Sequence, residues 1–152
     1  MEHGLDMIVV DHMHLMKPDR FLGNDVLERA EIVTSLAATY KWLNVTGLTL
    51  AQLSREVDKR AIRIPMLSDL RGSGGIEETA YAVMFLYREG AYDETAPQGP
   101  AKLYLAKHRG GPTGVVDLFW KAELSMFTYA ATFELNPRAS SRVSKPAQEV
   151  IL

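Results

Sequence analysis

Residues 5–10, with the sequence LDMIVV, form a nearly continuous apolar run of strand length that ends abruptly at Asp11. A run of this kind is typical of a strand that is covered on both faces in a parallel sheet. In open α/β sheets, ligands bind beyond the carboxyl ends of the strands. Asp11, directly after the run, is therefore the first candidate for a functional residue.

The rest of the sequence alternates between helix and strand signals. Asn24 can cap a helix over 25–43, which carries apolar residues at helical spacing and Lys41 in its last turn. Further strands are predicted over 45–51, 81–87, 101–109, 115–122 and 126–130. The segment GGPTG between two of them is typical of a hairpin turn, and the charged, glycine-rich segment 54–75 predicts a long mobile loop with at most a short helix near 68–71. This order predicts an α/β fold with Asp11 and Gln52 at the carboxyl ends of strands.

Composition narrows the class of protein but not its function. The chain has 152 residues, a net charge of −2 and no cysteine, so we expect one domain without disulfides or thiolate metal sites. It contains no long apolar run and no secretion signal pattern at its start, which predicts a cytoplasmic protein that does not insert into membranes. Because the overall charge is slightly negative, any nucleic-acid binding must use local clusters of Arg and Lys.

An apolar strand followed by Asp is the Walker B pattern of nucleotide-binding ATPases. In those proteins the carboxylate holds Mg²⁺, or its water, against the phosphates of ATP. The pattern is weak alone, since many buried strands end in an Asp that caps a loop. His12 and His14 beside Asp11 can also be read as metal ligands, although polar residues are common in such a turn.

Several longer segments make the interpretation more specific. In order along the chain they are LDMIVVDHMHLMKPDR, LAQLSREVDKR, PMLSDLRGSGGIE, VMFLYRE and AKHRGGPTG. Together they resemble the second half of the C-terminal RecA-like motor domain of DnaB-type replicative DNA helicases, from about residue 2 to residue 131. The resemblance implies a partial RecA-like motor domain over 1–133, with a C-terminal β-hairpin, and we expect a disordered tail over 134–152.

The resemblance also implies a role for individual residues. Asp11 resembles the Walker B aspartate that binds Mg²⁺ through ATP, and Gln52 resembles a sensor between the γ-phosphate and the DNA-binding loops. Lys107 and Arg109 resemble a basic pair that reaches into the ATP site of a neighbouring subunit, and residues two apart on a strand do share a face. Arg71 and Gly74, in LRGSGG, resemble a loop that holds single-stranded DNA. Without the family, each segment reads as an ordinary surface loop, strand end or solvated hairpin.

The expected activity is that of an ATP-dependent DNA helicase. The resemblance implies ATP and Mg²⁺ as cofactors, single-stranded DNA as a partner, a hexameric ring of identical subunits, and primase and loader proteins as further partners. The alternative is a non-catalytic interaction module, or a degenerate remnant, that joins helicase rings without hydrolysing ATP.

One motif of nucleotide-binding ATPases is absent from the sequence. The Walker A pattern GxxxxGK[ST], which cradles the phosphates, does not occur among the 152 residues. We therefore expect the chain alone not to turn over ATP. The resemblance places the Walker A strand between the strand that ends at Gln52 and the strand over 81–87, so we expect a gap or a rearranged pairing there. Gly72 and the segment VTG (45–47) also depart from the usual family pattern.

Overall fold

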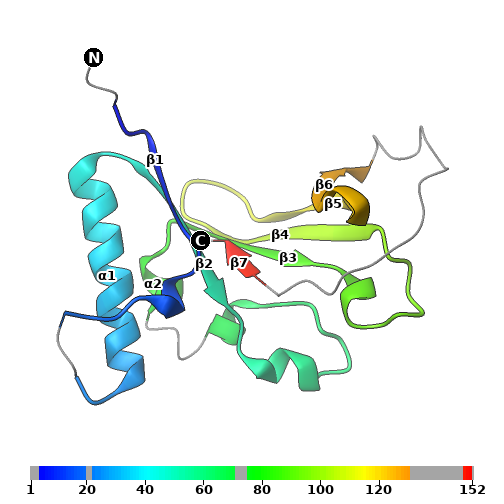
Figure 1. The fold of residues 1–152 in the computed structure, drawn as a ribbon, viewed down its shortest axis with the longest axis horizontal. Coiled ribbons are helices and arrows are strands. Elements are labelled where there is room, and N and C mark those ends of the chain that lie inside the picture. The colour runs from blue at the N-terminus through cyan, green and yellow to red at the C-terminus, as the bar shows by residue number, and fades with distance from the viewer. Residues whose placement is uncertain (1–3, 20–21, 71–74, 131–148, 152) are drawn as a thin grey trace.

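The computed structural model describes residues 4–19, 22–70, 75–130 and 149–151. In this part of the chain, strands form one sheet in the order β1-β2-β7-β3-β4-β5-β6 (Figure 1). The strands are β1 (Met7–Val10), β2 (Thr46–Gln52), β3 (Ala82–Tyr87), β4 (Pro100–His108), β5 (Gly114–Lys121), β6 (Met126–Tyr129) and β7 (Glu149–Ile151). The predicted α/β class is confirmed, and each predicted strand is present within a few residues of its expected range.

The helices are mostly short. They are α1 (Asp25–Leu43), α2 (Ile76–Thr79) and the 3-10 helices η1 (Met13–Leu15), η2 (Arg55–Lys59), η3 (Leu67–Leu70), η4 (Glu89–Ala91) and η5 (Ala122–Leu124). In the described ranges, no helix combines the length and apolar composition needed to cross a bilayer.

Local sequence signals determine where α1 begins and ends. The side chain of Asn24 accepts hydrogen bonds from the backbone N–H groups of Val26 (2.9 Å) and Leu27 (3.4 Å), which otherwise have no partner in the first turn. Asn44 ends the helix in a left-handed conformation, with φ of 52°. The predicted cap and both predicted helix boundaries are confirmed.

The hydrophobic core lies between the helices and the middle of the sheet. Its buried members come from α1, α2, η1, η3, β2 and β3: Met13, Ile32, Val33, Ala51, Leu70, Ile76, Val83 and Phe85. Alternate residues of a strand point to opposite faces, so one face of β2 and β3 packs on α1 and α2 through Ala51, Val83 and Phe85. This packing holds the two strands against one common layer of helices.

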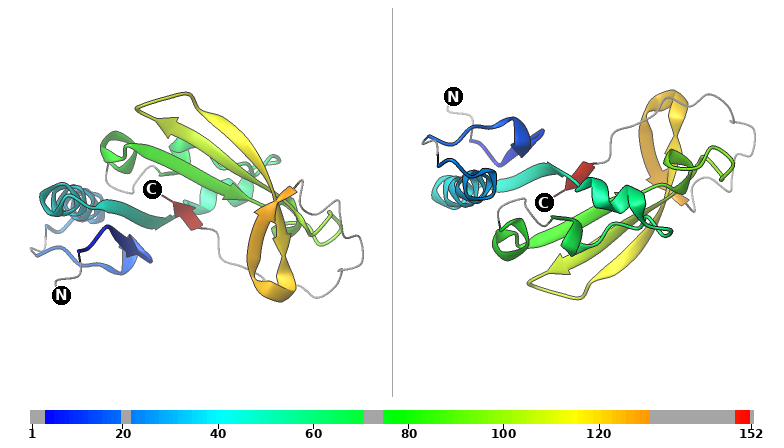
Figure 2. Two further views of the ribbon diagram at one scale, coloured as in Figure 1. Left: turned by 90° about the horizontal axis from the view of Figure 1, so that it is seen from above. Right: turned by 90° about the horizontal axis from the view of Figure 1, so that it is seen from below.

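β7 occupies the centre of the sheet, between β2 and β3 (Figures 1 and 2). It runs antiparallel to both, and therefore β2 and β3 run parallel to each other. The expected rearranged pairing at this place is confirmed. These residues fall in the segment where the sequence predicts a disordered tail; instead, the β-branched pair Val150 and Ile151 completes a three-residue strand. Residues 131–148 lie outside the described residues.

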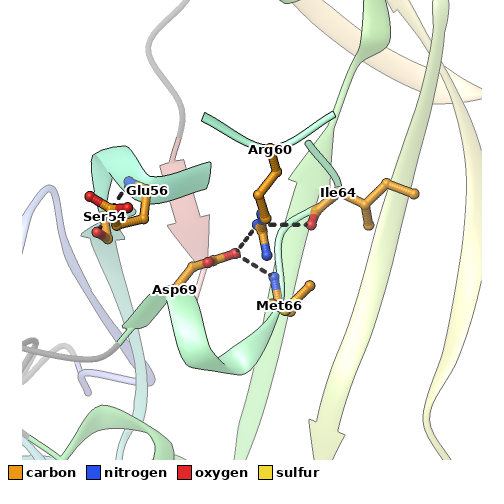
Figure 3. Close-up of polar contacts among 6 residues, drawn as sticks. All are labelled: Ser54, Glu56, Arg60, Ile64, Met66 and Asp69. Carbon is orange, nitrogen blue, oxygen red and sulfur yellow. Dashed lines mark hydrogen bonds and ion pairs between the residues drawn. The ribbon is translucent and has the colours of Figure 1, made fainter. Parts of the chain in front are cut away.

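The segment between β2 and β3 contains more structure than the predicted mobile loop. Asp69 is buried, and its Oδ2 accepts hydrogen bonds from Arg60 Nη2 (2.6 Å) and from the backbone N–H of Met66 (2.8 Å) (Figure 3). Arg60 Nη2 also donates to the carbonyl of Ile64 (3.2 Å), while the Ser54 N–H donates to the Asp69 carbonyl (3.1 Å). This set of bonds, the Asp69 clamp, ties η3 back to the end of β2.

A glycine on β2 allows α1 to pack closely on the sheet. A Cβ atom at Gly47 would lie 2.0 Å from the ring of Tyr40, far inside van der Waals contact. The Tyr40 hydroxyl is fixed in turn by a 2.8 Å hydrogen bond with Thr49 Oγ1. The Tyr40 ring thus fills the space above Gly47, the last residue of the VTG segment.

We expect Gly47→Ala to lower the free energy of unfolding by about 2 kcal/mol, because the added methyl group forces the Tyr40 ring away from β2. Gly114→Ala is the matched control, since a Cβ at Gly114 meets nothing within 4 Å. Chemical denaturation of the two variants measures the difference. Equal stability of both variants would contradict the close packing of Tyr40 on Gly47.

The Asp69 clamp gives a second prediction. Arg60→Ala leaves a buried carboxylate without its cation, so we expect a loss of about 2 kcal/mol of stability. Lys102→Ala breaks an ion pair of the same length, 2.6 Å to Asp117, that is exposed to solvent, and should change stability little. If both substitutions lower the free energy of unfolding in urea by similar amounts, burial of Asp69 does not account for the stability that the clamp contributes.

Candidate functional site

Asp11 and Gln52 end neighbouring strands at one edge of the sheet. β1 and β2 are parallel, with Val10 paired to Thr49, so Asp11 follows β1 beside the last residues of β2. Both side chains are exposed to solvent. The carboxyl ends of parallel strands form the usual binding edge of an α/β sheet, and the sequence predicts both residues there. The structure places them on adjacent strands of that edge.

His14 connects these two strand ends. Its Nδ1 accepts a hydrogen bond from the backbone N–H of Gln52 (3.3 Å), so Nδ1 is unprotonated in this arrangement. Burial, and then the nearby His12 and Arg29, lower the pKa of His14 from its ordinary value of 6.5. The sequence interpretation missed this role, because a histidine in a turn carries no signal for a partner 38 positions away.

The rings of His12 and His14 pack edge to face, with centroids 5.7 Å apart. Across the described ranges, no group of three or more His, Cys, Asp or Glu side chains is placed to hold a metal ion. The arrangement of His14 therefore favours a link between strands over the metal-ligand interpretation.

Lys107 and Arg109 both contact the short helix α2. Lys107 Nζ donates to the carbonyls of Ala80 (2.9 Å) and Glu77, and Arg109 Nη2 donates to the carbonyl of Glu78. Cations are favourable at the carboxyl end of a helix, where carbonyl groups lack partners. The prediction that the two side chains share a face agrees with their common target, although Arg109 lies one residue beyond β4.

The basic pair lies at the opposite edge of the sheet from Asp11 and Gln52. β4 runs antiparallel to β3, and His108 pairs with Ala82, the first residue of β3. Since β3 is parallel to β2, the end of β4 lies at the amino edge of the parallel strands. Within one chain, therefore, the structure does not bring the basic pair together with the carboxylate.

Arg71 and Gly74 lie outside the described residues, so the predicted DNA-binding loop is defined only by its flanks. On its amino side is η3, held by the Asp69 clamp. On its carboxyl side is α2, held by the basic pair. The sequence interpretation missed both anchors, because a charged residue in a charged segment gives no sign that its side chain is buried or paired.

The His14 link predicts a pH dependence of stability. A lowered pKa in the folded state means that the unfolded chain binds more protons below about pH 6.5, so this contribution is complete above that pH and is lost as the pH falls. We expect His14→Asn, which keeps an acceptor but cannot titrate, to reduce the fall in melting temperature between about pH 8 and about pH 5.5. His108→Asn, on the hairpin, is the matched control; an identical pH profile for wild type and His14→Asn would rule out the link.

Known proteins resemble most of the length of this chain. Residues 1–129 match the family model of the DnaB-like helicase C terminal domain. The replicative DNA helicase DnaB of Pasteurella multocida (strain Pm70) is 42% identical over 125 residues, which are 82% of this chain and 27% of that protein. DnaB of Haemophilus influenzae gives the same identity and coverage. The chain thus spans about a quarter of the length of these curated relatives.

Two solved structures share the fold. One is described as a DnaB-like replicative helicase and its interactions with primase; it has a TM-score of 0.76 and 34% identity, and the match covers 80% of this chain and 29% of that chain. The other is described as an ATPase domain, with a TM-score of 0.77 and 34% identity, and the match covers 81% of this chain and 44% of that chain. The family match, the curated relatives and the shared fold agree, and the chain belongs to the DnaB-like helicase C-terminal domain family.

Proposed function

We propose that this chain forms part of the motor of an ATP-driven replicative DNA helicase, which moves along single-stranded DNA as a ring and separates duplex DNA. The observation that carries the proposal is that residues 1–129 match the family while Asp11 and Gln52 stand on adjacent strands at the binding edge of the sheet. The family indicates the reaction, and the positions of these two side chains indicate where the nucleotide would bind. We expect the protein to act in the cytoplasm.

Asp11 fits the role of the carboxylate that would hold Mg²⁺ bound to ATP. It is exposed, it directly follows β1, and an oxygen ligand is what Mg²⁺ prefers. Bound MgATP would supply the phosphoryl group that is transferred to water. A Walker A sequence to cradle its phosphates does not occur among the 152 residues, so that part of the site would come from sequence outside them.

Lys107 and Arg109 are proposed to act on the ATP site of a neighbouring subunit. Their position at the opposite edge from Asp11 supports action between subunits, since a cation at one edge does not serve a phosphate at the other. An arginine supplied in this way neutralises charge that develops during phosphoryl transfer. To reach a neighbour, Lys107 and Arg109 would release the α2 carbonyls that they hold in the isolated chain.

Arg71 and Gly74 are proposed to contact the backbone of single-stranded DNA, where arginine offers charge and glycine allows close approach. Their loop follows η3 and precedes α2, so the Asp69 clamp and the basic pair act on its two flanks. A coupling from the ATP site through Lys107 and Arg109 to α2 would reach this loop directly. Primase is a further proposed partner, because one structural relative is described together with primase; loader proteins and a hexameric ring are proposed from the resemblance.

The second candidate function is a non-catalytic interaction module that joins helicase rings. One observation favours it: Lys107 and Arg109 already have partners within the chain, in a sequence without Walker A. The genomic sequence upstream of the Met1 codon discriminates between the candidates. An in-frame Walker A segment supports the motor, and a true start without one supports the module.

A mixing experiment tests the motor and its basic pair. The part of Pasteurella multocida DnaB that precedes the matched region is joined to this chain, and rings are assembled from Arg109→Ala and Asp11→Asn subunits. Where an Asp11→Asn subunit donates Arg109 to an Arg109→Ala subunit, one complete site forms again. We expect the mixture to recover ATPase activity while each pure variant stays nearly inactive, since loss of such an arginine costs about 10³ to 10⁵ in rate.

Subunit exchange is verified first, by mass spectrometry of the mixed rings. With exchange established, a mixture no more active than the pure variants would refute the proposed role of Arg109 between subunits. Full activity of the pure Arg109→Ala ring would refute it as well. Lys102→Ala, an exposed cation elsewhere on β4, serves as the control and should leave the rate unchanged.

A further inference from the structure

The end of β4 extends beyond the part of the strand that pairs with β5. The β4–β5 pairing stops at Leu105, whereas β4 continues to His108, which pairs with Ala82 of β3. In the described residues, the last part of β4 is therefore supported by strand pairing on the β3 side alone. Arg109, the next residue, is exposed to solvent. Any further support for the backbone of Arg109 has to come from contacts other than a second strand.

Tyr81, which lies between α2 and β3, supplies such contacts. The backbone N–H of Arg109 donates a hydrogen bond to the Tyr81 carbonyl (2.9 Å), and this bond continues the β3–β4 ladder by one residue. The rings of Tyr81 and His108 pack edge to face, with centroids 5.6 Å apart and planes inclined at 73°. Tyr81 thus holds the start of the turn through its main chain and through its ring.

Both rings lie directly against the turn that follows Arg109. A Cβ atom at Gly110 would lie 2.0 Å from the Tyr81 hydroxyl oxygen, and a Cβ atom at Gly111 would lie 3.0 Å from the His108 ring. Neither glycine has a positive φ, so the backbone conformation does not require glycine at these positions. The absence of side chains instead allows the rings to approach the backbone closely. Tyr81, His108, Gly110 and Gly111 together form a unit that we call the hairpin brace.

The hairpin brace does not use the side chain of Arg109. That side chain donates to the Glu78 carbonyl of α2, and it has to leave this carbonyl to act on a neighbouring subunit. Tyr81 contacts the Arg109 backbone and the His108 ring, so its contacts remain when the Arg109 side chain changes partner. A reacting group that is held in place before the reaction loses less entropy during it. With its backbone held, Arg109 has only its side chain left to order.

We propose that Tyr81 is a positioning residue for Arg109. Through the hairpin brace, Tyr81 keeps the backbone of Arg109 in place while the side chain exchanges the α2 carbonyl for the ATP site of a neighbouring subunit. The inference rests on the proposed function for the reaction that Arg109 serves, and Tyr81 acts only through Arg109. The hairpin brace itself belongs to the single chain and requires neither nucleotide nor a ring.

Amide hydrogen exchange of the full 152-residue chain, followed by NMR, tests the hairpin brace. We expect Tyr81→Ala to speed exchange of the Arg109 amide roughly fivefold relative to the core amide of Phe85, the size expected for loss of one edge-to-face ring contact. Tyr81→Phe keeps the ring and should exchange as wild type does. Tyr129→Ala removes another exposed tyrosine, on β6, and is the matched control. Equal exchange of the Arg109 amide in Tyr81→Ala and wild type would overturn the proposal.

The mixed rings test whether Tyr81 acts through Arg109. In these rings the Asp11→Asn subunit donates Arg109 and the Arg109→Ala subunit receives it. Tyr81→Ala in the donating subunit should lower the recovered kcat about tenfold, less than the roughly hundredfold cost of a misplacement of about 1 Å, and should leave KM for ATP unchanged. Tyr81→Ala in the receiving subunit, which has no Arg109 to position, should change neither constant.

Two results of the mixing experiment would overturn the proposal. Equal losses from both placements of Tyr81→Ala would show a general effect on folding, and a donating subunit as active as its parent would show no effect on Arg109. If the parent mixture recovers no ATPase activity, the proposed motor fails. The exchange measurement on the isolated chain then still decides whether Tyr81 holds the backbone of Arg109.

Discussion

Three residues of β7 join two blocks of sheet that have no other strand pairing between them in the described part of the chain. One block is β1 and β2, which carries Asp11 and Gln52. The other is β3 to β6, which carries Lys107 and Arg109. The core beneath them, which includes Ile32 and Val33 of α1 and Val83 and Phe85 of β3, is the second connection. The relative position of the two candidate site pairs therefore depends on a short central strand and one apolar layer.

Charged groups fix the segments around the candidate DNA-binding loop. Asp69 is buried and holds η3 through Arg60 and a backbone N–H, whereas Lys107 and Arg109 hold α2 through its carbonyl groups. In the first anchor the carboxylate is buried, so removal of Arg60 would leave it without its cation. The second anchor uses Lys107 and Arg109, which in the proposed mechanism act on the ATP site of a neighbouring subunit. These two side chains therefore have two alternative partners, the α2 carbonyl groups and that ATP site.

Features that depend on neighbouring residues along the chain could be predicted from the sequence. The cap of α1 at Asn24, the strand before Asp11 and the β4–β5 hairpin all follow from local patterns, and the positions of Asp11 and Gln52 follow from the strands that precede them. β7, α2, the Asp69 clamp and the His14 link could not be predicted in the same way. β7, the anchoring of α2 and the His14 link each depend on a partner that is distant in sequence. The Asp69 clamp joins residues that are nine and three positions apart, but nothing in a charged segment indicates that one of its carboxylates is buried.

Solution NMR of the full chain tests the central claim most directly, because the claim concerns which strands are neighbours. Cross-strand backbone contacts should connect Val150 with Ala51 on one side and with Phe85 on the other, in the antiparallel register of the structure. These contacts should be present at high dilution, as expected for pairing within one chain. Direct contacts between β2 and β3, or the absence of any contact from 149–151 to either strand, would contradict a sheet that is joined through a short antiparallel central strand.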